Sequence, residues 1–282
     1  HKMNEKDITV VITSFRSENK IINCINSFSS SIKIIVIENS NDQNLKIKLE
    51  KNYTNIDCIL SSENLGYAKG NNLGLSKVKT KYALIINPDA KVHSQTIKNF
   101  FLTASNKPNF AIIAPYVQES NTISDDNVRK DIIEVKSVKG FAMFMNLSQF
   151  KDTGYFDENF FIYFEEIDLC RRLIKNNKKI FLDTNIKITH AGGTSHEESI
   201  NYEMEKSRNW HWMWSTFYYY KKHYGYVFAL FKILPKFFSS MFKSIFFRIL
   251  SNNEKKDIYY CRFQGILNSM LLRKSWYRPK IN

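Results

Sequence analysis

The chain has 282 residues, 43% hydrophobic and 15% aromatic, enough to bury one large core or a domain with an appendage. Its four cysteines lack C-x-x-C spacing, which argues against a zinc site and against a secreted disulfide framework. The net charge is +14, but residues 203–282 contain 15 Lys and Arg against 4 Asp and Glu, which accounts for 11 of these charges. This uneven distribution, without a recognised RNA- or DNA-binding motif, argues against a nucleic-acid partner.

The first half of the sequence alternates predicted strands and helices. The β-branched run Ile8–Ser14 predicts a strand, Asn19–Phe28 a helix and Ile32–Ser40 a second strand. Further apolar runs predict strands at Ile56–Ser61, Tyr82–Asn87 and Phe110–Pro115. This alternation predicts an α/β fold with a mainly parallel sheet covered by helices, in which ligands bind beyond the carboxyl ends of the strands.

Polar residues at the predicted strand ends are therefore candidates for binding and chemistry, although turn formation alone also explains them. They are Thr13–Arg16, Glu38–Ser40 and Asn87–Asp89. Between the last two segments, Gly66, Gly70 and Gly74 recur every four residues, a spacing that does not match G-x-G-x-x-G. The sequence therefore argues against a dinucleotide-dependent oxidoreductase.

The segment FDENFFIYFEEIDLCRR, residues 156–172, sets three carboxylates against a run of aromatic residues. One interpretation is a helix start, because acids are favoured in a first turn and Arg171 and Arg172 follow one turn later. The other is an acidic site in an apolar environment, which would raise a carboxyl pKa. The segment by itself does not decide between them.

The tail from Tyr226 to Leu250 mixes large apolar residues with cations. Lys232, Lys236 and Lys243 fall on one face at 3.6 residues per turn, while Pro235 argues against a single unbroken helix. Charges interrupt every stretch long enough to span a bilayer. Two interpretations stay open: this tail lies on an anionic membrane surface, or it forms an amphipathic helical bundle packed on the main domain.

Seven segments in order resemble the family 2 glycosyltransferases, and are most similar to bacterial rhamnosyltransferases of surface polysaccharide synthesis. They are VVITSFRSENKIINCINS, VIENS, ENLGYAKGNNLG, LIINPDA, VKGFAMFMN, GYFDENFFIYFEEIDLCRRL and ITHAGGTS. The resemblance covers about residues 8–225. It implies a GT-A fold, a Rossmann-like nucleotide-binding sheet flanked by helices, in residues 3–205, followed by a basic, amphipathic helical region in residues 206–282.

The resemblance also implies a nucleotide-binding set. Glu38 matches the acid that recognises the base, at a position where Asp is usual in the family. The other matching positions are Thr13, Ser14 and Arg16 in the first loop, Asn64, Gly66, Lys69 and Asn72 in the loop that closes over the base and diphosphate, and Asn87. A cationic side chain such as Lys69 can neutralise phosphate charge.

The NPDA segment matches the family motif that holds a divalent cation on the diphosphate. Asp89 is the carboxylate ligand that this match implies, and Asn87 replaces the first acid of the usual D-x-D pattern. His190 matches a family histidine near the same ion. Oxygen ligands suit Mg²⁺ or Mn²⁺, and imidazole favours Mn²⁺, so we expect a divalent cation cofactor.

In the acidic segment the resemblance implies that Glu166 is the base that deprotonates the acceptor hydroxyl. Glu165 and Asp168 share a helix face, and we expect them to bind the acceptor or to pair with the following arginines. Gly140 and Phe141 match the floor of the sugar pocket. One displacement with one base inverts the configuration at the anomeric carbon.

We therefore expect a metal-dependent, inverting hexosyltransferase that moves rhamnose from dTDP-rhamnose to a lipid-linked or growing glycan, as in lipopolysaccharide or capsule synthesis. Another UDP- or dTDP-sugar donor, for example of galactofuranose, GlcNAc or galactose, and a catalytically silent membrane scaffold are the alternatives. We expect no secretory segment, a cytoplasmic location on the inner face of the cell membrane, and anionic lipid contact through residues 226–250. The sequence is also compatible with a homodimer.

Overall fold

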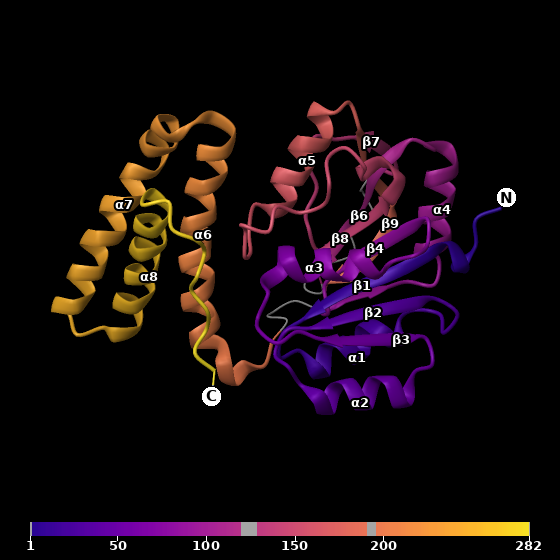
Figure 1. Ribbon diagram of the computed structural model, residues 1–282, viewed down its shortest axis with the longest axis horizontal. Helices are drawn as coiled ribbons and strands as arrows, with labels where there is room; N and C mark the ends of the chain where they lie inside the picture. Colours follow the sequence, from indigo (N-terminus) through magenta and orange to yellow (C-terminus); the bar gives the residue numbers. More distant parts are fainter. Residues whose placement is uncertain (1, 120–128, 191–195, 282) are drawn as a thin grey trace. The chain divides into compact units, whose positions relative to one another are not determined.

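The computed structural model describes residues 2–119, 129–190 and 196–281. The chain divides into two compact units, each with its own set of elements (Figure 1). The first unit contains His1–Phe156 and Glu166–Glu197, and the second contains Asp157–Glu165 and Glu198–Asn282. The short segment of residues 157–165 thus belongs with helices that follow it by some forty residues, which the sequence did not indicate.

The first unit is built on a nine-stranded mixed sheet within the described residues, in the order β3-β2-β1-β4-β8-β6-β9-β5, with β7 paired to β9 (Figure 1). The strands are β1 Ile8–Ser14, β2 Lys33–Glu38, β3 Ile56–Leu60, β4 Tyr82–Ile86, β5 Ala90–Val92, β6 Phe110–Glu119, β7 Ile132–Glu134, β8 Ala142–Asn146 and β9 Lys179–His190. The strands β3, β2, β1 and β4 are parallel, which confirms the predicted nucleotide-binding half of the fold. Beyond β4 the strand β8 pairs antiparallel on both sides.

The central strands form continuous apolar runs because helices cover both of their faces. In β1, β2 and β4 the residues Val10, Ile35 and Leu84 are at most 1% exposed. The helices of this unit are α1 Glu18–Asn26, α2 Gln43–Asn52, α3 Gly66–Lys77, α4 Thr96–Asn106 and α5 Glu165–Lys175. The first residue of α5, Glu165, is assigned to the second unit. Two 3₁₀ turns lie at Glu5–Asp7 and Leu147–Phe150. The start of α2 is fixed by Asp42, whose side chain accepts a hydrogen bond from the Leu45 N–H.

The regular glycines of α3 have a packing role. A Cβ on Gly70 would lie 2.7 Å from Thr13 Cγ2, and one on Gly74 would lie 2.4 Å from Val11 Cγ1. Residues four apart share one helix face, so the two glycines let α3 lie directly against β1. Gly66, with φ of 78°, begins this helix in a backbone conformation that other residues rarely adopt.

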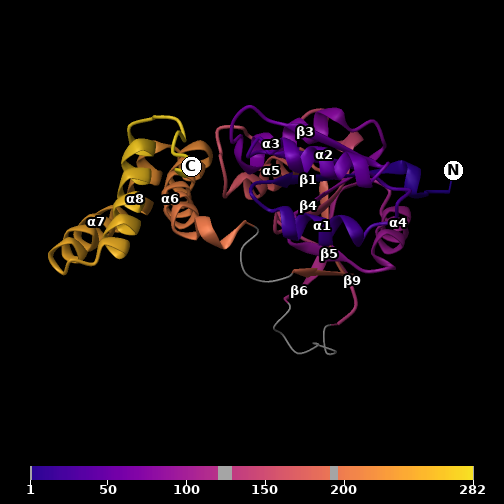
Figure 2. The ribbon, with the colours of Figure 1, turned by 90° about the horizontal axis from the view of Figure 1, so that it is seen from below.

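The second unit is a bundle of α6 Asn201–Tyr224, α7 Tyr226–Ile249 and α8 Asn253–Met270, preceded by a 3₁₀ turn at Glu198–Ile200 (Figures 1 and 2). Its core contains Met213, Phe217, Ala229, Ile233 and Ile266. The expectation that Pro235 interrupts the helix was wrong, because α7 continues through this exposed residue. Its missing N–H removes one hydrogen bond from the helix interior. Within the described chain, no helix combines the length and the apolarity that a bilayer-spanning segment needs.

The aromatic run of residues 160–164 also packs inside this second unit. Phe160 lies edge-on to Tyr218, with ring centroids 4.9 Å apart, and Phe161 stacks on His211 at 4.4 Å. Tyr163 and Phe164 both contact Trp212 at 5.3 Å. The four rings therefore have their aromatic partners on α6. That these rings raise the pKa of the Glu166 carboxyl stays a prediction.

Candidate active site

The parallel half of the sheet brings the predicted strand-end residues to one edge. The register pairs Ser14, the last residue of β1, with Glu38, the last residue of β2, and the Asn39 N–H donates to the Ser14 carbonyl. Asn87–Asp89 follows β4, which lies on the other side of β1. The carboxyl ends of these neighbouring strands therefore form one polar edge, as expected for an open parallel sheet.

Asp89 is buried at this edge and pairs with His190. Its Oδ2 lies 2.9 Å from His190 Nε2, and β5 next to β9 holds the two segments together. The Asp89 Oδ1 and the Asn87 Oδ1 are both buried and have no hydrogen-bond partner among the described residues. Burial and the charge of Asp89 raise the pKa of the neighbouring Cys24 thiol well above its ordinary value. Buried oxygens without partners are costly, so this site has unused capacity for a ligand.

The chemistry of these donors would suit a divalent cation. One carboxylate, one amide oxygen and one imidazole leave several positions open, which suits a cation held between protein and phosphates. No cluster of three His, Cys, Asp or Glu side chains able to hold a metal occurs within residues 2–119, 129–190 and 196–281. The rest of the ITHAGGTS motif, residues 191–195, lies outside the described residues.

Gly140 and Phe141 connect this pair to the acidic helix. The Phe141 carbonyl accepts a hydrogen bond of 2.8 Å from the Asn87 N–H, and the Phe141 ring lies edge-on to His190 at 5.6 Å. A Cβ on Gly140 would lie 3.2 Å from Glu166 Cβ and 3.3 Å from Glu166 Cγ. The absence of a side chain at Gly140 thus lets Glu166 lie directly against the segment that borders the Asp89 site.

Glu166 is half-buried in the first turn of α5. The two residues before this helix, Tyr163 and Phe164, have positive φ values of 71° and 65°. Left-handed backbone is rare for bulky residues, and two in succession fix the direction from which the chain enters α5. Glu165, at 4% exposure, is buried in the same turn.

The structure gives Asp168 a bracing role. Its fully buried carboxylate pairs with Arg172 one turn later, Oδ2 to Nε 2.9 Å. Arg172 also donates to the carbonyls of Thr153 and Tyr155, so the ion pair fastens the preceding turn to α5. Of the two roles expected for Asp168, acceptor binding and arginine pairing, the contacts favour pairing.

Glu38 organises its own loop. Its carboxylate is 0% exposed and accepts hydrogen bonds from the Ser40 N–H, the Ser40 hydroxyl and the Asp42 N–H. A base N–H would have to replace one of these donors. Glu38 is therefore bonded within its own loop, and its contact with a nucleotide base stays a prediction.

Two asparagines join α3 to the strand ends: Asn39, already among the strand-end candidates, and Asn71, which the sequence reasoning did not single out. Asn71 accepts a 2.8 Å hydrogen bond from the Thr13 hydroxyl, and Asn39 donates to the Gly66 carbonyl at 3.1 Å. Tyr67, also missed, donates to the Gly140 carbonyl and so joins α3 to the Glu166 side. Tyr67 and Asn71 both lie inside the segment ENLGYAKGNNLG, and their position beside the matched residues Gly66 and Asn72 was the available signal.

The remaining predicted nucleotide residues have mixed environments. The Asn64 side chain accepts from the Gly66 N–H, and Lys69 is exposed on the first turns of α3. Arg16 pairs with Glu197 at 3.1 Å, while the Ser14 hydroxyl is buried. The amide of Asn72 is bonded to both the N–H and the carbonyl of Phe156, which gives it a structural role, and its nucleotide contact stays a prediction.

Solved structures place the architecture among GT-A folds. The chain is similar to Staphylococcus aureus TarS residues 1–349 in complex with UDP-GlcNAc, with a TM-score of 0.56 and 14% identity, over 96% of this chain and 93% of that one. It is also similar to GalNAc-T7 with UDP, GalNAc and Mn²⁺, with a TM-score of 0.57 and 13% identity, over 68% of this chain and 44% of that one. These likenesses show the class of fold, that of the GT-A structures.

The family follows from the sequence itself. The model of glycosyl transferase family 2 matches residues 9–172, more than half of the chain, and the chain belongs to this family. It is 29% identical over 152 residues, 45% of its length, to the low-salt glycan biosynthesis hexosyltransferase Agl10 of Haloferax volcanii, and spans 49% of that relative. It is 25% identical over 203 residues to the rhamnosyltransferase WbbL of Escherichia coli K12, 60% of this chain and 75% of the relative.

Proposed function

We propose that this chain is an inverting hexosyltransferase that uses a nucleoside diphosphate sugar. The observation that carries the proposal is the arrangement at the sheet edge. Buried, unpartnered oxygens of Asn87 and Asp89 suit a diphosphate-bound cation, and Gly140–Phe141 joins them to a half-buried carboxylate, Glu166. A leaving-group site and a base held by one short segment are what a single displacement requires.

In the proposed reaction Glu166 accepts the proton of an acceptor hydroxyl. The hydroxyl oxygen forms a bond to the anomeric carbon while the bond from that carbon to the diphosphate oxygen breaks. The electron pair of the broken bond leaves with the nucleoside diphosphate, and the configuration at the anomeric carbon inverts. Gly140 allows Glu166 its position, since a larger residue there would meet its Cβ and Cγ.

The donor is held from the other side by the loops after β1 and β2 and by the start of α3. Lys69 is exposed on α3 and carries a positive charge suited to phosphate. Asp89, Asn87 and His190 would hold a Mn²⁺ or Mg²⁺ ion, which supplies positive charge to the departing diphosphate. The Mn²⁺ and UDP named with GalNAc-T7, and the UDP-GlcNAc named with TarS, are consistent with this donor class.

For the donor sugar we propose rhamnose carried on dTDP. The support is the motif resemblance and a distant relative that is a rhamnosyltransferase. The chain spans only about half of the first curated relative it matches, so its donor is a proposal. Other UDP- or dTDP-sugars are the alternative donors. For the acceptor we propose a hydroxyl of a lipid-linked or growing surface glycan.

The test is transfer from a panel of dTDP- and UDP-sugars to a glycan acceptor, with the anomeric configuration of the product read by NMR. The expected result is turnover with dTDP-rhamnose, dependent on Mn²⁺ or Mg²⁺, and inversion of configuration. A product with retained configuration would reject the single-displacement mechanism. Neither transfer nor nucleotide-sugar hydrolysis with any donor, in protein that melts cooperatively, would favour the silent scaffold.

A further inference from the structure

The helix α7 presents an apolar surface that the bundle does not cover. One side of the helix is buried through Ala229, Ile233 and Ser240 against the cores of α6 and α8. The other side carries large apolar residues that are 47–76% exposed. These residues, the apolar stripe, are Val227, Phe231, Phe238, Phe242, Ile245 and Ile249. At about 100° per residue they fall within an arc of about 60°, so they form one continuous line along the helix.

Positive charges border the apolar stripe. Lys232, Lys236 and Lys243 follow one flank within an arc of about 40°, and Arg248 lies on the opposite flank. α7 contains no acidic residue, and none of these four cations has an ion pair among the described residues. Lys232 and Lys243 rest over aromatic rings, at 5.6 Å from Phe228 and 5.2 Å from Tyr259.

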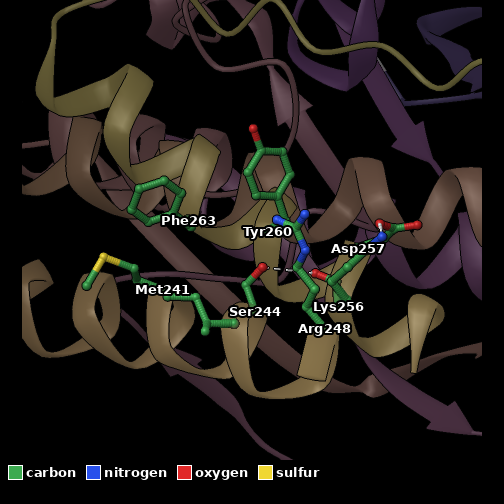
Figure 3. Close-up of a pocket in the computed structure, with 8 residues that line it drawn as sticks. Met241, Ser244, Arg248, Lys256, Asp257, Tyr260 and Phe263 are labelled. Atoms are coloured by element: carbon green, nitrogen blue, oxygen red, sulfur yellow. Dashed lines mark hydrogen bonds and ion pairs between the residues drawn. The ribbon is translucent and has the colours of Figure 1, made fainter. Parts of the chain in front are cut away.

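A cavity of about 570 Å³ opens beside the apolar stripe on the Arg248 flank, between α7 and α8 (Figure 3). Its walls combine apolar side chains, among them Met241 and Phe263, with the cations Arg248 and Lys256. The acidic Asp257 is engaged by Lys256 at 3.2 Å and by the Tyr202 hydroxyl. Arg248 therefore brings an unneutralised positive charge to an apolar recess, which suits an anionic head group attached to a hydrocarbon chain.

We propose that α7 docks this unit on an anionic lipid bilayer. The apolar stripe enters the boundary between head groups and acyl chains, while the flanking lysines and Arg248 extend along their stems to lipid phosphates. The cavity beside Arg248 takes up one such head group. This inference concerns a different surface from the sugar-transfer site and does not depend on the proposed function.

The charges favour a membrane over a second copy of the chain. Two α7 faces brought together would set four cations of one copy against four of the other, with no acid on either helix to neutralise them. A continuous line of six large apolar side chains, each 47–76% exposed, is rarely left open to water. An anionic bilayer supplies both the hydrocarbon and the negative charge.

The test is flotation of the full chain with vesicles of phosphatidylcholine alone or with about 30% phosphatidylglycerol, at physiological salt. Wild-type protein floats with the anionic vesicles and much less with the neutral ones. The double variant Phe231→Ser/Phe242→Ser loses about tenfold or more of the bound fraction. The matched control, Ile47→Ser/Leu102→Ser, removes two similarly exposed apolar residues from α2 and α4. Its bound fraction stays at the wild-type value.

The charges are tested separately. Lys236→Glu/Lys243→Glu abolishes the preference for anionic vesicles, whereas Lys98→Glu/Lys151→Glu, which changes two exposed lysines of the first unit, lowers it only slightly. Arg248→Ala weakens the preference severalfold. Melting temperatures confirm that each variant is folded. Equal flotation of wild type and the stripe variant would overturn the proposal. The proposal would also be overturned, in favour of self-association, if the wild type were a dimer that does not bind vesicles and Phe231→Ser/Phe242→Ser were a monomer.

Discussion

His190 Nε2 lies 2.9 Å from Asp89 Oδ2, so a residue at the end of β9 closes the site that follows β4. The contact uses one oxygen of the carboxylate and leaves the buried Oδ1 without a partner among the described residues. A carboxylate that is held in place yet still has an open oxygen is prepared to bind a ligand.

Asp89→Ala should remove the cation-dependent part of nucleotide binding. Calorimetry with dTDP or UDP should show wild-type affinity rising with Mn²⁺, and the variant should lose at least about tenfold of that gain, since a ligand is missing. The control is Asp57→Ala, which removes an exposed acid paired with Lys33 on the same sheet. An unchanged response to Mn²⁺ in Asp89→Ala would exclude the metal assignment.

Glu166→Gln should reduce kcat about a hundredfold or more, because the amide cannot accept the acceptor proton. Donor affinity should stay near the wild-type value, since the change preserves size and lies away from the nucleotide loops. Glu158→Gln, an exposed acid in the same acidic segment, serves as the control and should retain turnover. Near-normal turnover of Glu166→Gln would move the base to another residue.

Gly140→Ala tests whether the position of Glu166 matters as well as its charge. The new methyl group would lie 3.2 Å from Glu166 Cβ, tighter than ordinary contact, so the side chain must shift. We expect kcat to fall about ten- to a hundredfold with little change in donor affinity. In a Glu166→Gln background the same substitution should have no further effect, because the group being positioned is gone. Equal losses in both backgrounds would indicate a general disturbance.

Arg172→Met should destabilise the protein while sparing nucleotide binding. It removes the ion pair to the fully buried Asp168 and the bonds to two backbone carbonyls, and we expect a loss of about 3 kcal/mol in the free energy of unfolding. Lys175→Met, an exposed change in the same helix, should cost less than about 0.5 kcal/mol. Urea unfolding measures both. If the two variants were equally stable, the bracing role of Asp168 would be wrong.

His211 should make the second unit less stable in acid. Burial lowers the pKa of this imidazole from its ordinary value of 6.5 to about 3, and outweighs the raising effect of its contact with the Tyr277 carbonyl. Between these two values the unfolded chain binds a proton that the folded chain does not. Stability therefore rises with pH across this window, by about 1.4 kcal/mol per unit for this group, and is lost as pH falls.

The variant His211→Gln keeps a donor for the Tyr277 carbonyl, 2.7 Å from the imidazole in the wild type, but cannot titrate. Its unfolding free energy should depend less steeply on pH between about 6.5 and 3 than that of the wild type. The measurement is urea unfolding at several pH values in this window. Parallel pH profiles for the two proteins would show that His211 does not set the acid sensitivity.

Local sequence patterns were sufficient for the parallel half of the fold. Apolar runs such as Ile8–Ser14 and Tyr82–Asn87 are long, uninterrupted and bounded by polar turns, so their strands were predicted to within a residue or two. The polar residues after them were correctly expected at one edge, because parallel strands must end together. The antiparallel strand β8 was not predicted, since its pairing with β4 and β6 depends on partners far apart in the chain.

The meaning of individual site residues was less predictable. Gly70 and Gly74 repeat at four residues for close packing on β1, which requires knowing which strand lies under α3. Asn72 and Asp168 match or neighbour binding motifs but are held by Phe156 and Arg172. Whether a polar side chain is free for a ligand depends on partners that no local pattern reveals.

The sequence by itself determined the alternation of strands and helices, the identity of the acids, amides and glycines, and the amphipathic character of the tail, because these follow from residue type and spacing. Only the tertiary structure decided which oxygen of Asp89 stays open, that Glu166 lies against Gly140, and that α7 has one covered and one uncovered apolar side. Each of these depends on contacts between segments distant in sequence, where packing and burial fix what a side chain can still bind.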